Sequence, residues 1–194
     1  MENKGYFISG IGTDVGKTVI AMLLAEYLEL PYWKPIQTGN ILDAETIQNK
    51  KPNTEIVPTL YSLEMPAAPL IADKDKIIDI NLVISSIPST PLIIEGAGGL
   101  MVPIHQDKLW CDIISVWQMP VILVARNYLG YINHTLLSLY YLKNKGIKVA
   151  AVILNESQND TTEDYIQSLY PNILFFKIPT IESMESYSYN FEGL

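Results

Sequence analysis

The sequence has a single cysteine, Cys111, in 194 residues, so no internal disulfide can form. A chain without disulfides suits a reducing compartment, and we expect a cytoplasmic protein in which Cys111 is a small buried residue. No stretch approaches the roughly 18 uninterrupted apolar residues of a membrane-spanning helix. The opening residues, MENKGYFISG, pass directly into a run typical of a strand, so no signal peptide is expected.

Positive charge is also scarce. Thirteen Lys and Arg residues stand against 21 Asp and Glu residues, which gives a net charge of −8. This balance argues against a nucleic-acid-binding surface and against attachment to an anionic membrane. It leaves room for an anionic small molecule, because a few lysines can form a local positive pocket in an acidic protein.

The chain does have regularly spaced apolar runs, and 48% of its residues are hydrophobic. We expect one domain, residues 1–194. Strands are predicted at residues 5–10, 31–35, 91–96, 120–125, 149–155 and 172–179, and helices at 17–28, 109–118, 131–145 and 161–169. The segment from Asn40 to Ser89 is less regular. Strands that lack a polar face are typical of a parallel sheet covered on both sides. The pattern predicts an α/β fold: a doubly wound, mostly parallel sheet with helices on both faces. The glycine-rich stretch GIGTDVGKTV, which follows the first predicted strand, makes the P-loop NTPase type the expected one.

The stretch GIGTDVGKTV, from Gly10 to Val19, lies between a predicted strand and a predicted helix. That is the position of a phosphate-binding loop, in which backbone N–H groups and the start of the helix attract phosphate. Lys17 is expected to reach the terminal phosphates and Thr18 to bind Mg²⁺. The common pattern would place the first glycine at position 11, whereas here it is Gly10. A glycine-rich turn without a ligand is the alternative.

A metal site needs carboxylates beside this loop. Glu95 follows four apolar residues in PLIIEGAGG and precedes three glycines, which leave space for a ligand. Asp43, in ILDAET, is a second candidate. The alternatives are an ordinary charge at the end of a strand for Glu95 and a helix N-cap for Asp43.

Two further polar residues follow predicted strands. Lys34, in WKPIQTG, could meet Lys17 at an anionic reacting group, or it could simply be solvated. Asn155 ends the strand VAAVILN, where its amide could bind the edge of a base. The chain lacks the Asn-Lys-x-Asp guanine motif, so adenine is favoured.

Together these segments resemble the dethiobiotin synthetase family. Its phosphate-binding loop has five residues between the two glycines, the spacing of Gly10 and Gly16. The similarity continues through KPIQTG, YSLEMPAAPLIA, IIEGAGGLMVPI, PVILVARNYLGYINHTLL, GIKVAAVILNE and IPTIES. The chain departs from the family at Ile11 and Gly12, which replace Thr-Asp, and at Leu70, where histidine is frequent. The connection from Gly39 to Asp43 is shorter than in many members.

The resemblance implies that 7,8-diaminononanoate, CO₂ and ATP become dethiobiotin, ADP and phosphate through a carbamate. It implies catalysis by Lys34 and Lys17, and Mg²⁺ on Thr18, Asp43 and Glu95. It also implies a homodimer in which the partner subunit binds the substrate carboxylate. The implied ATP-binding residues are Thr13, Asp14, Val15, Gly16, Lys17, Thr18, Val19, Asp43, Glu95, Gly96, Ala97, Gly98, Asn155, Pro179, Thr180 and Ile181. The implied substrate-binding residues are Thr38, Gly130, Tyr131, Ile132 and Asn133.

Two other functions are compatible with such a loop. One is a related ATPase of the cobyrinate-diamide synthase type, whose chains generally carry an additional glutaminase domain that 194 residues would not accommodate. The other is a partition-type ATPase switch, which carries a signature lysine near the start of the loop, where this chain has Ile11. Such switches also need a basic surface or an amphipathic tail, and the closing residues SYSYNFEGL form neither.

Overall fold

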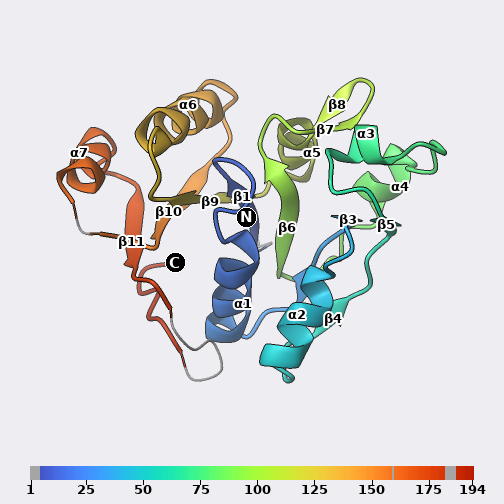
Figure 1. Cartoon of the computed structure of the whole chain (residues 1–194), viewed down its shortest axis with the longest axis horizontal. Coiled ribbons are helices and arrows are strands. Elements are labelled where there is room, and N and C mark those ends of the chain that lie inside the picture. Colours follow the sequence, from blue (N-terminus) through green and yellow to red (C-terminus); the bar gives the residue numbers. More distant parts are fainter. Residues whose placement is uncertain (1–4, 159, 182–186) are drawn as a thin grey trace.

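A seven-stranded, entirely parallel sheet forms the centre of the molecule (Figure 1). The computed structural model describes residues 5–158, 160–181 and 187–194. In spatial order the strands are β11 (Leu174–Ile178), β10 (Val149–Asn155), β9 (Val121–Arg126), β1 (Gly5–Gly10), β6 (Leu92–Gly99), β2 (Tyr32–Trp33) and β4 (Ile56–Val57). β1 is the middle strand of this sheet, and every one of its residues is therefore buried.

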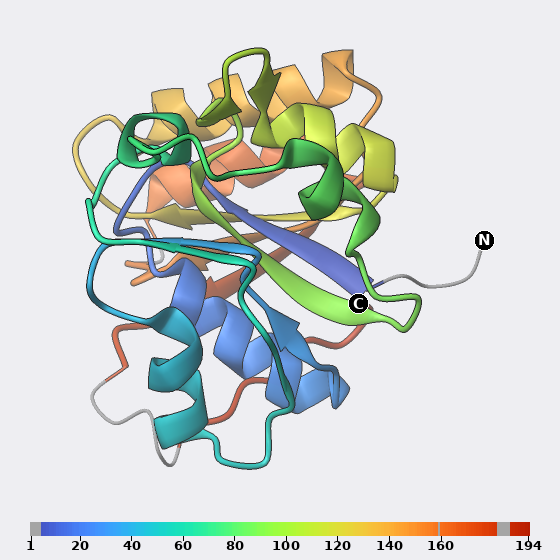
Figure 2. The same ribbon diagram turned by 90° about the vertical axis from the view of Figure 1, so that its right-hand side faces the viewer.

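Helices cover both faces of this sheet (Figure 2). α1 (Lys17–Leu28) and α2 (Asp43–Lys50) lie on one face, together with the C-terminal segment, residues 187–194. The other face is covered by α3 (Pro69–Ala72), α4 (Ile80–Ser85), α5 (Trp110–Trp117), α6 (Tyr131–Asn144) and α7 (Thr161–Leu169). The predicted doubly wound α/β fold is therefore confirmed.

The hydrophobic core divides along the sheet because successive strand side chains point to opposite faces. On β2, Tyr32 joins the core beneath α1, and Trp33 joins the core beneath α5. The C-terminal segment completes the first of these cores: Phe191 is 1% exposed and its ring centroid lies 5.5 Å from that of Tyr27 in α1. No helix among the described residues is long and apolar enough to cross a membrane. The cytoplasmic location stays a prediction.

Several boundaries agree with the sequence prediction and others shift slightly. β1, α1, β10 and α7 begin and end at the predicted residues. The predicted strand at 31–35 shortens to Tyr32–Trp33, since Pro35 has no N–H for a sheet hydrogen bond. The irregular segment at 40–89 contains α2, β4, α3, α4 and β5 (Tyr61–Leu63). β5 pairs with β3 (Ile36–Thr38), and β7 (Pro103–His105) forms a small hairpin with β8 (Lys108–Leu109).

Candidate functional site

The loop between β1 and α1 turns sharply at Gly16, which precedes the first residue of α1 and has a φ of 90°. A Cβ atom on Gly16 would lie 2.2 Å from Nδ2 of Asn155. Only glycine suits this position, because the backbone is left-handed and the neighbouring amide is in direct contact. That amide, from the end of β10, donates a hydrogen bond of 3.1 Å to the Val15 carbonyl. Asn155 thus supports the loop, and its role in binding adenine stays a prediction.

Two cationic side chains donate hydrogen bonds to backbone carbonyls of the same loop. Lys17 is 7% exposed, and its ammonium donates to the Gly12 carbonyl at 3.1 Å. Burial lowers the pKa of Lys17 despite the attraction of Glu95. On the outer side, Arg126 at the end of β9 donates to the Asp14 carbonyl at 3.1 Å. The lysine is thereby kept inside the loop, where terminal phosphates bind in proteins of this type.

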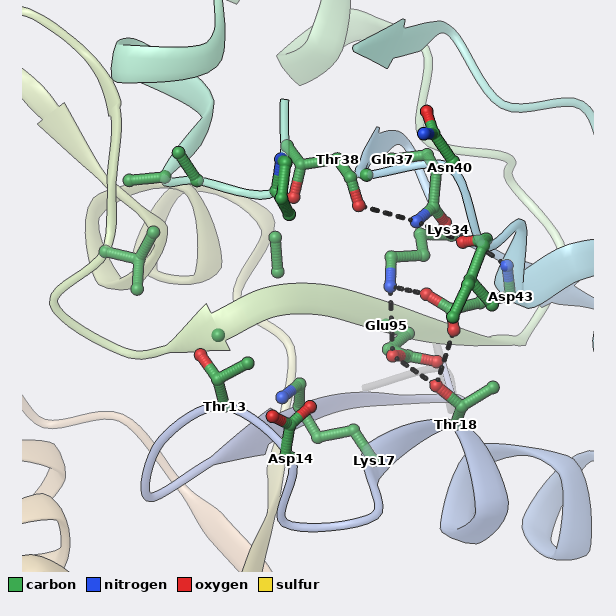
Figure 3. A pocket seen from close by; sticks show the side chains of 18 of the residues that line it. Thr13, Asp14, Lys17, Thr18, Lys34, Gln37, Thr38, Asn40, Asp43 and Glu95 are labelled. Carbon is green, nitrogen blue, oxygen red and sulfur yellow. Dashed lines mark hydrogen bonds and ion pairs between the residues drawn. The ribbon is translucent and has the colours of Figure 1, made fainter. Parts of the chain in front are cut away.

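A compact group of charges lies beside α1 (Figure 3). The Thr18 hydroxyl lies within hydrogen-bonding distance of Asp43 Oδ1, at 2.9 Å, and of Glu95 Oε1, at 3.0 Å, and its one proton is shared between them. The ammonium of Lys34 forms an ion pair with Asp43 and a second one, of 3.1 Å, with Glu95. Four side chains that are distant in the sequence therefore converge at the carboxyl edge of the sheet.

This arrangement fixes the protonation of Lys34. Burial lowers the pKa of its ammonium, but the carboxylates of Glu95 and Asp43 raise it by more, so that the pKa lies above its usual value. Lys34 is consequently a permanent cation near neutral pH. It is the positive charge that balances two carboxylates in this structure, and one of them, Glu95, is only 1% exposed.

The same oxygens fit a magnesium ion. Thr18 Oγ1, Asp43 Oδ1 and Glu95 Oε1 are hard oxygen ligands, and each carboxylate oxygen lies within 3.0 Å of the hydroxyl. Among the described residues there is no group of three or more His, Cys, Asp and Glu side chains placed to bind a metal. A metal at this edge would therefore depend on the hydroxyl, two carboxylates and water or phosphate oxygens. The alternative role of Asp43 as a helix N-cap is wrong, because Leu42 is the N-cap residue of α2 and Asp43 is the first residue of the helix.

A cavity of about 760 Å³ opens over these residues. Its lining includes twelve residues predicted to bind ligands: Thr13, Asp14, Gly16, Lys17, Thr18, Val19, Lys34, Thr38, Asp43, Glu95, Ala97 and Gly98. The other predicted residues lie outside that lining, although the structure describes all of them: Val15, Gly96, Asn155, 130–133 and 179–181.

Comparison with known proteins agrees with this geometry. A sequence profile described as an AAA domain matches residues 4–188. The ATP-dependent dethiobiotin synthetase of Christiangramia forsetii is 43% identical over 174 residues, which cover 86% of this chain and 83% of the relative. The chain belongs to the dethiobiotin synthetase family. The ATP-dependent dethiobiotin synthetase of Agrobacterium fabrum is 41% identical over 84% of this chain and 80% of its own length.

The fold of this family member is shared more widely. The crystal structure of a ParA family ATPase from Chlorobium tepidum superimposes with a TM-score of 0.59 over 92% of this chain and 86% of that chain. Only 14% of the residues are identical, so the likeness concerns the fold. It is consistent with the predicted P-loop NTPase type.

Two buried residues of the site were missed by the sequence analysis. The hydroxyl of Tyr32 donates to Glu95 Oε2 at 2.7 Å. Gln37 donates to the carbonyls of Thr38 at 3.0 Å and Ile41 at 2.8 Å, and accepts from the Asp43 N–H at 3.3 Å. Gln37 thus stabilises the connection that precedes Asp43, which is shorter than in many family members. The alternation along the strand could have indicated that Tyr32 faces the same core as Glu95.

The predicted clamp for the substrate carboxylate lies at the start of α6. Gly130 precedes the helix with a φ of 98°. Tyr131 uses both of its donors within the chain: its N–H donates to the Tyr128 carbonyl at 3.0 Å and its hydroxyl to Asp160 at 3.3 Å. The N–H groups of Ile132 and Asn133 also belong to the first turn, where a helix supplies no acceptor. These two groups are therefore the better placed of the set to bind an anion.

Proposed function

We propose that this chain makes dethiobiotin from 7,8-diaminononanoate, CO₂ and ATP by way of a carbamate, with ADP and phosphate as the other products. The ATP-dependent synthesis of dethiobiotin follows from the family to which the chain belongs. The observation that supports the carbamate route is the presence of two buried lysines, Lys17 and Lys34, around one cavity with Thr18, Asp43 and Glu95.

The first step needs a neutral amine, because only a neutral amine can attack CO₂. Nearby ammonium groups disfavour protonation of a bound amine, since like charges repel. Lys34 already lowers the pKa of Lys17 in this way, although burial is the larger cause. The amine nitrogen bonds to the carbon of CO₂ and releases a proton to water. The resulting carbamate is an anion, which Lys17 and Lys34 attract.

The second step transfers the γ-phosphoryl group of ATP to a carbamate oxygen, and ADP leaves. Lys17 and the backbone of the loop orient the phosphates, and preorganised charges of this kind lower the barrier without rearranging during the reaction. The second amine then attacks the carbamate carbon, phosphate leaves, and another proton is released as the ureido ring closes.

We propose Mg²⁺ as the cofactor, held by Thr18, Asp43 and Glu95. When bound, it offsets the negative charge of the transferring phosphoryl group. In this structure Lys34 forms ion pairs with the two carboxylates that this ion would require. With a divalent cation held on these oxygens, the ammonium of Lys34 would no longer be needed there and would be free to turn towards the carbamate. Thr38, in the lining of the same cavity, is proposed to contact the substrate.

We also propose how the nucleotide is bound. Asn155 at the end of β10 and residues Pro179, Thr180 and Ile181 after β11 lie beyond the phosphate-binding loop at the same edge of the sheet. They are proposed to contact adenine, while the glycines that follow Glu95 give the phosphates space. We propose that the whole chain acts as one domain, since strands from residue 5 to residue 178 share one sheet.

A homodimer is proposed because, within one chain, Lys34 and the predicted carboxylate clamp at the start of α6 lie far apart. Lys34 follows β2 and the α6 clamp follows β9, and β1 and β6 lie between these strands. Neighbouring strands are about 4.8 Å apart, so roughly 14 Å separates β2 from β9, with the phosphate-binding loop between them. Leu129 is fully exposed beside the clamp, and Leu137 and Tyr140 are exposed on α6, as a contact surface would require. A partner subunit could then supply the carboxylate clamp.

The test is an assay of ADP release by the purified chain with Mg²⁺ and ATP. Release is expected to require both diaminononanoate and bicarbonate, and dethiobiotin is expected to appear in the product mixture by mass spectrometry. ADP release that needs neither substrate would contradict the proposed function.

A further inference from the structure

Tyr32 is a fully buried tyrosine on β2. In the sheet it pairs with Ile93 of β6, and Glu95 lies two residues further along that strand on the same face. A phenol is long enough to span this interval, and its hydroxyl meets Glu95 Oε2 at 2.7 Å. Tyr32 is therefore directed at the carboxylate by the register of the two strands.

The two oxygens of Glu95 have separate partners. Oε1 accepts hydrogen bonds from Thr18 at 3.0 Å and from Lys34 at 3.1 Å, on the side of the cavity. Oε2 accepts from Tyr32, on the side of the core. Glu95 is only 1% exposed, so an oxygen without a donor there would lose its hydration without compensation. The hydroxyl of Tyr32 satisfies one oxygen and so leaves the other to face the cavity.

We propose that Tyr32 is a positioning residue that sets the metal affinity of the site: it holds Glu95 with Oε1 directed at Thr18 and at the Mg²⁺ position. This inference rests on the magnesium site of the proposed function. Tyr32 contacts neither nucleotide nor substrate in this scheme, and acts only through the carboxylate. Removing a hydrogen-bond partner that orients a metal ligand typically costs about 10- to 100-fold in metal affinity or activity.

The alternative is that Tyr32 only fills the core, in which case phenylalanine would serve equally well. Tyr6 offers a matched control. It flanks Ile93 from the other side, on β1, in the same core, and is 9% exposed.

The experiment measures how strongly Mg²⁺ promotes nucleotide binding, without turnover. A non-hydrolysable ATP analogue is titrated by calorimetry into wild type, Tyr32→Phe, Tyr6→Phe and Glu95→Gln, first with a chelator and then at increasing Mg²⁺. With the chelator present, we expect Tyr32→Phe to bind the ATP analogue as tightly as wild type does. It should need about 10-fold or more Mg²⁺ to reach the same increase in affinity for the analogue. Tyr6→Phe should match wild type. In a Tyr32→Phe/Glu95→Gln double variant the tyrosine change should add nothing, because both act through one carboxylate.

Thermal unfolding of each variant defines a temperature at which all of them are folded, and the titrations are made below it. An unchanged Mg²⁺ requirement in Tyr32→Phe, with a raised one in Glu95→Gln, would overturn the role of Tyr32 and leave the metal site standing. If Glu95→Gln is unchanged as well, both the positioning role and the metal site are wrong. Dethiobiotin formation by the wild type is measured separately, so its failure is distinguishable from either result.

Discussion

Replacing Lys34 by alanine should affect both the stability of the protein and its turnover. Lys34 is the cation that balances Asp43 and Glu95, and its side chain is 7% exposed. Removing one partner of a buried ion pair typically costs about 3–5 kcal/mol of stability, because the remaining charge is left uncompensated. We therefore expect the metal-free Lys34→Ala variant to be destabilised by an amount of this order. Mg²⁺ should stabilise it more than it stabilises wild type, because the competing ammonium is absent.

Turnover should fall as well, and Mg²⁺ should not restore it. Losing one preorganised charge at a reacting group costs on the order of 10²–10³ in rate. Dethiobiotin formation should fall by that factor even at saturating Mg²⁺, while nucleotide binding survives. The measurements are thermal unfolding with and without Mg²⁺, and product formation by mass spectrometry.

Lys51→Ala is the control. Lys51 pairs with Glu26 at 2.8 Å, but the Glu26 side chain is 44% exposed. Such a surface pair is worth at most about 1 kcal/mol, and its loss should not alter the response to Mg²⁺. Near-normal turnover by folded Lys34→Ala protein would remove Lys34 from the mechanism. Equal stabilisation of variant and wild type by Mg²⁺ would refute its role as the balancing cation.

Further substitutions test the metal site, the shared substrate site and the C-terminal contribution to the core. Glu95→Gln should sharply raise the Mg²⁺ concentration needed for activity, and Asp43→Asn should raise it less. A magnesium-bound structure in which Asp43 points away from the metal would exclude Asp43 as a ligand. Mixing a Lys34→Ala chain with a Gly130→Glu chain should restore activity that neither homodimer has, and demonstrated subunit exchange without restored activity would exclude a shared site. Phe191→Ala should lower the free energy of unfolding by about 3–5 kcal/mol, measured by denaturant titration; a change below 1 kcal/mol would mean that the C-terminal segment does not stabilise the core.

The sequence predicts the central sheet well because its strands are continuous apolar runs. GYFISG and VAAVILN coincide with β1 and β10, since a parallel strand that is buried on both faces is a nearly continuous apolar run with recognisable ends. The segment at 40–89 could not be predicted in the same way. β4 has only two residues and α3 only four, and side-chain hydrogen bonds stabilise this region, such as those that Asp73 accepts from the N–H groups of Ile77 and Ile78.

The charged group of the site was largely predictable for a topological reason. Residues that follow parallel strands meet at one edge of a sheet, so Lys34 and Glu95 were expected to converge there. The roles of Tyr32 and Gln37 were not predictable, because they depend on strand register and on the path of one short loop. Asn155 lay at the predicted edge, but its hydrogen bond to the Val15 carbonyl could not be read from the sequence.

The central claim, that CO₂ becomes the ureido carbon through a carbamate activated by ATP, is tested most directly by isotope labelling. The purified chain is incubated with ATP, Mg²⁺, diaminononanoate and ¹³C-bicarbonate, and the mass of dethiobiotin is measured together with the amount of ADP. We expect dethiobiotin that is heavier by one mass unit, with one ADP formed for each molecule of product. Labelled bicarbonate that leaves the product mass unchanged, or ADP formed without dethiobiotin, would contradict it.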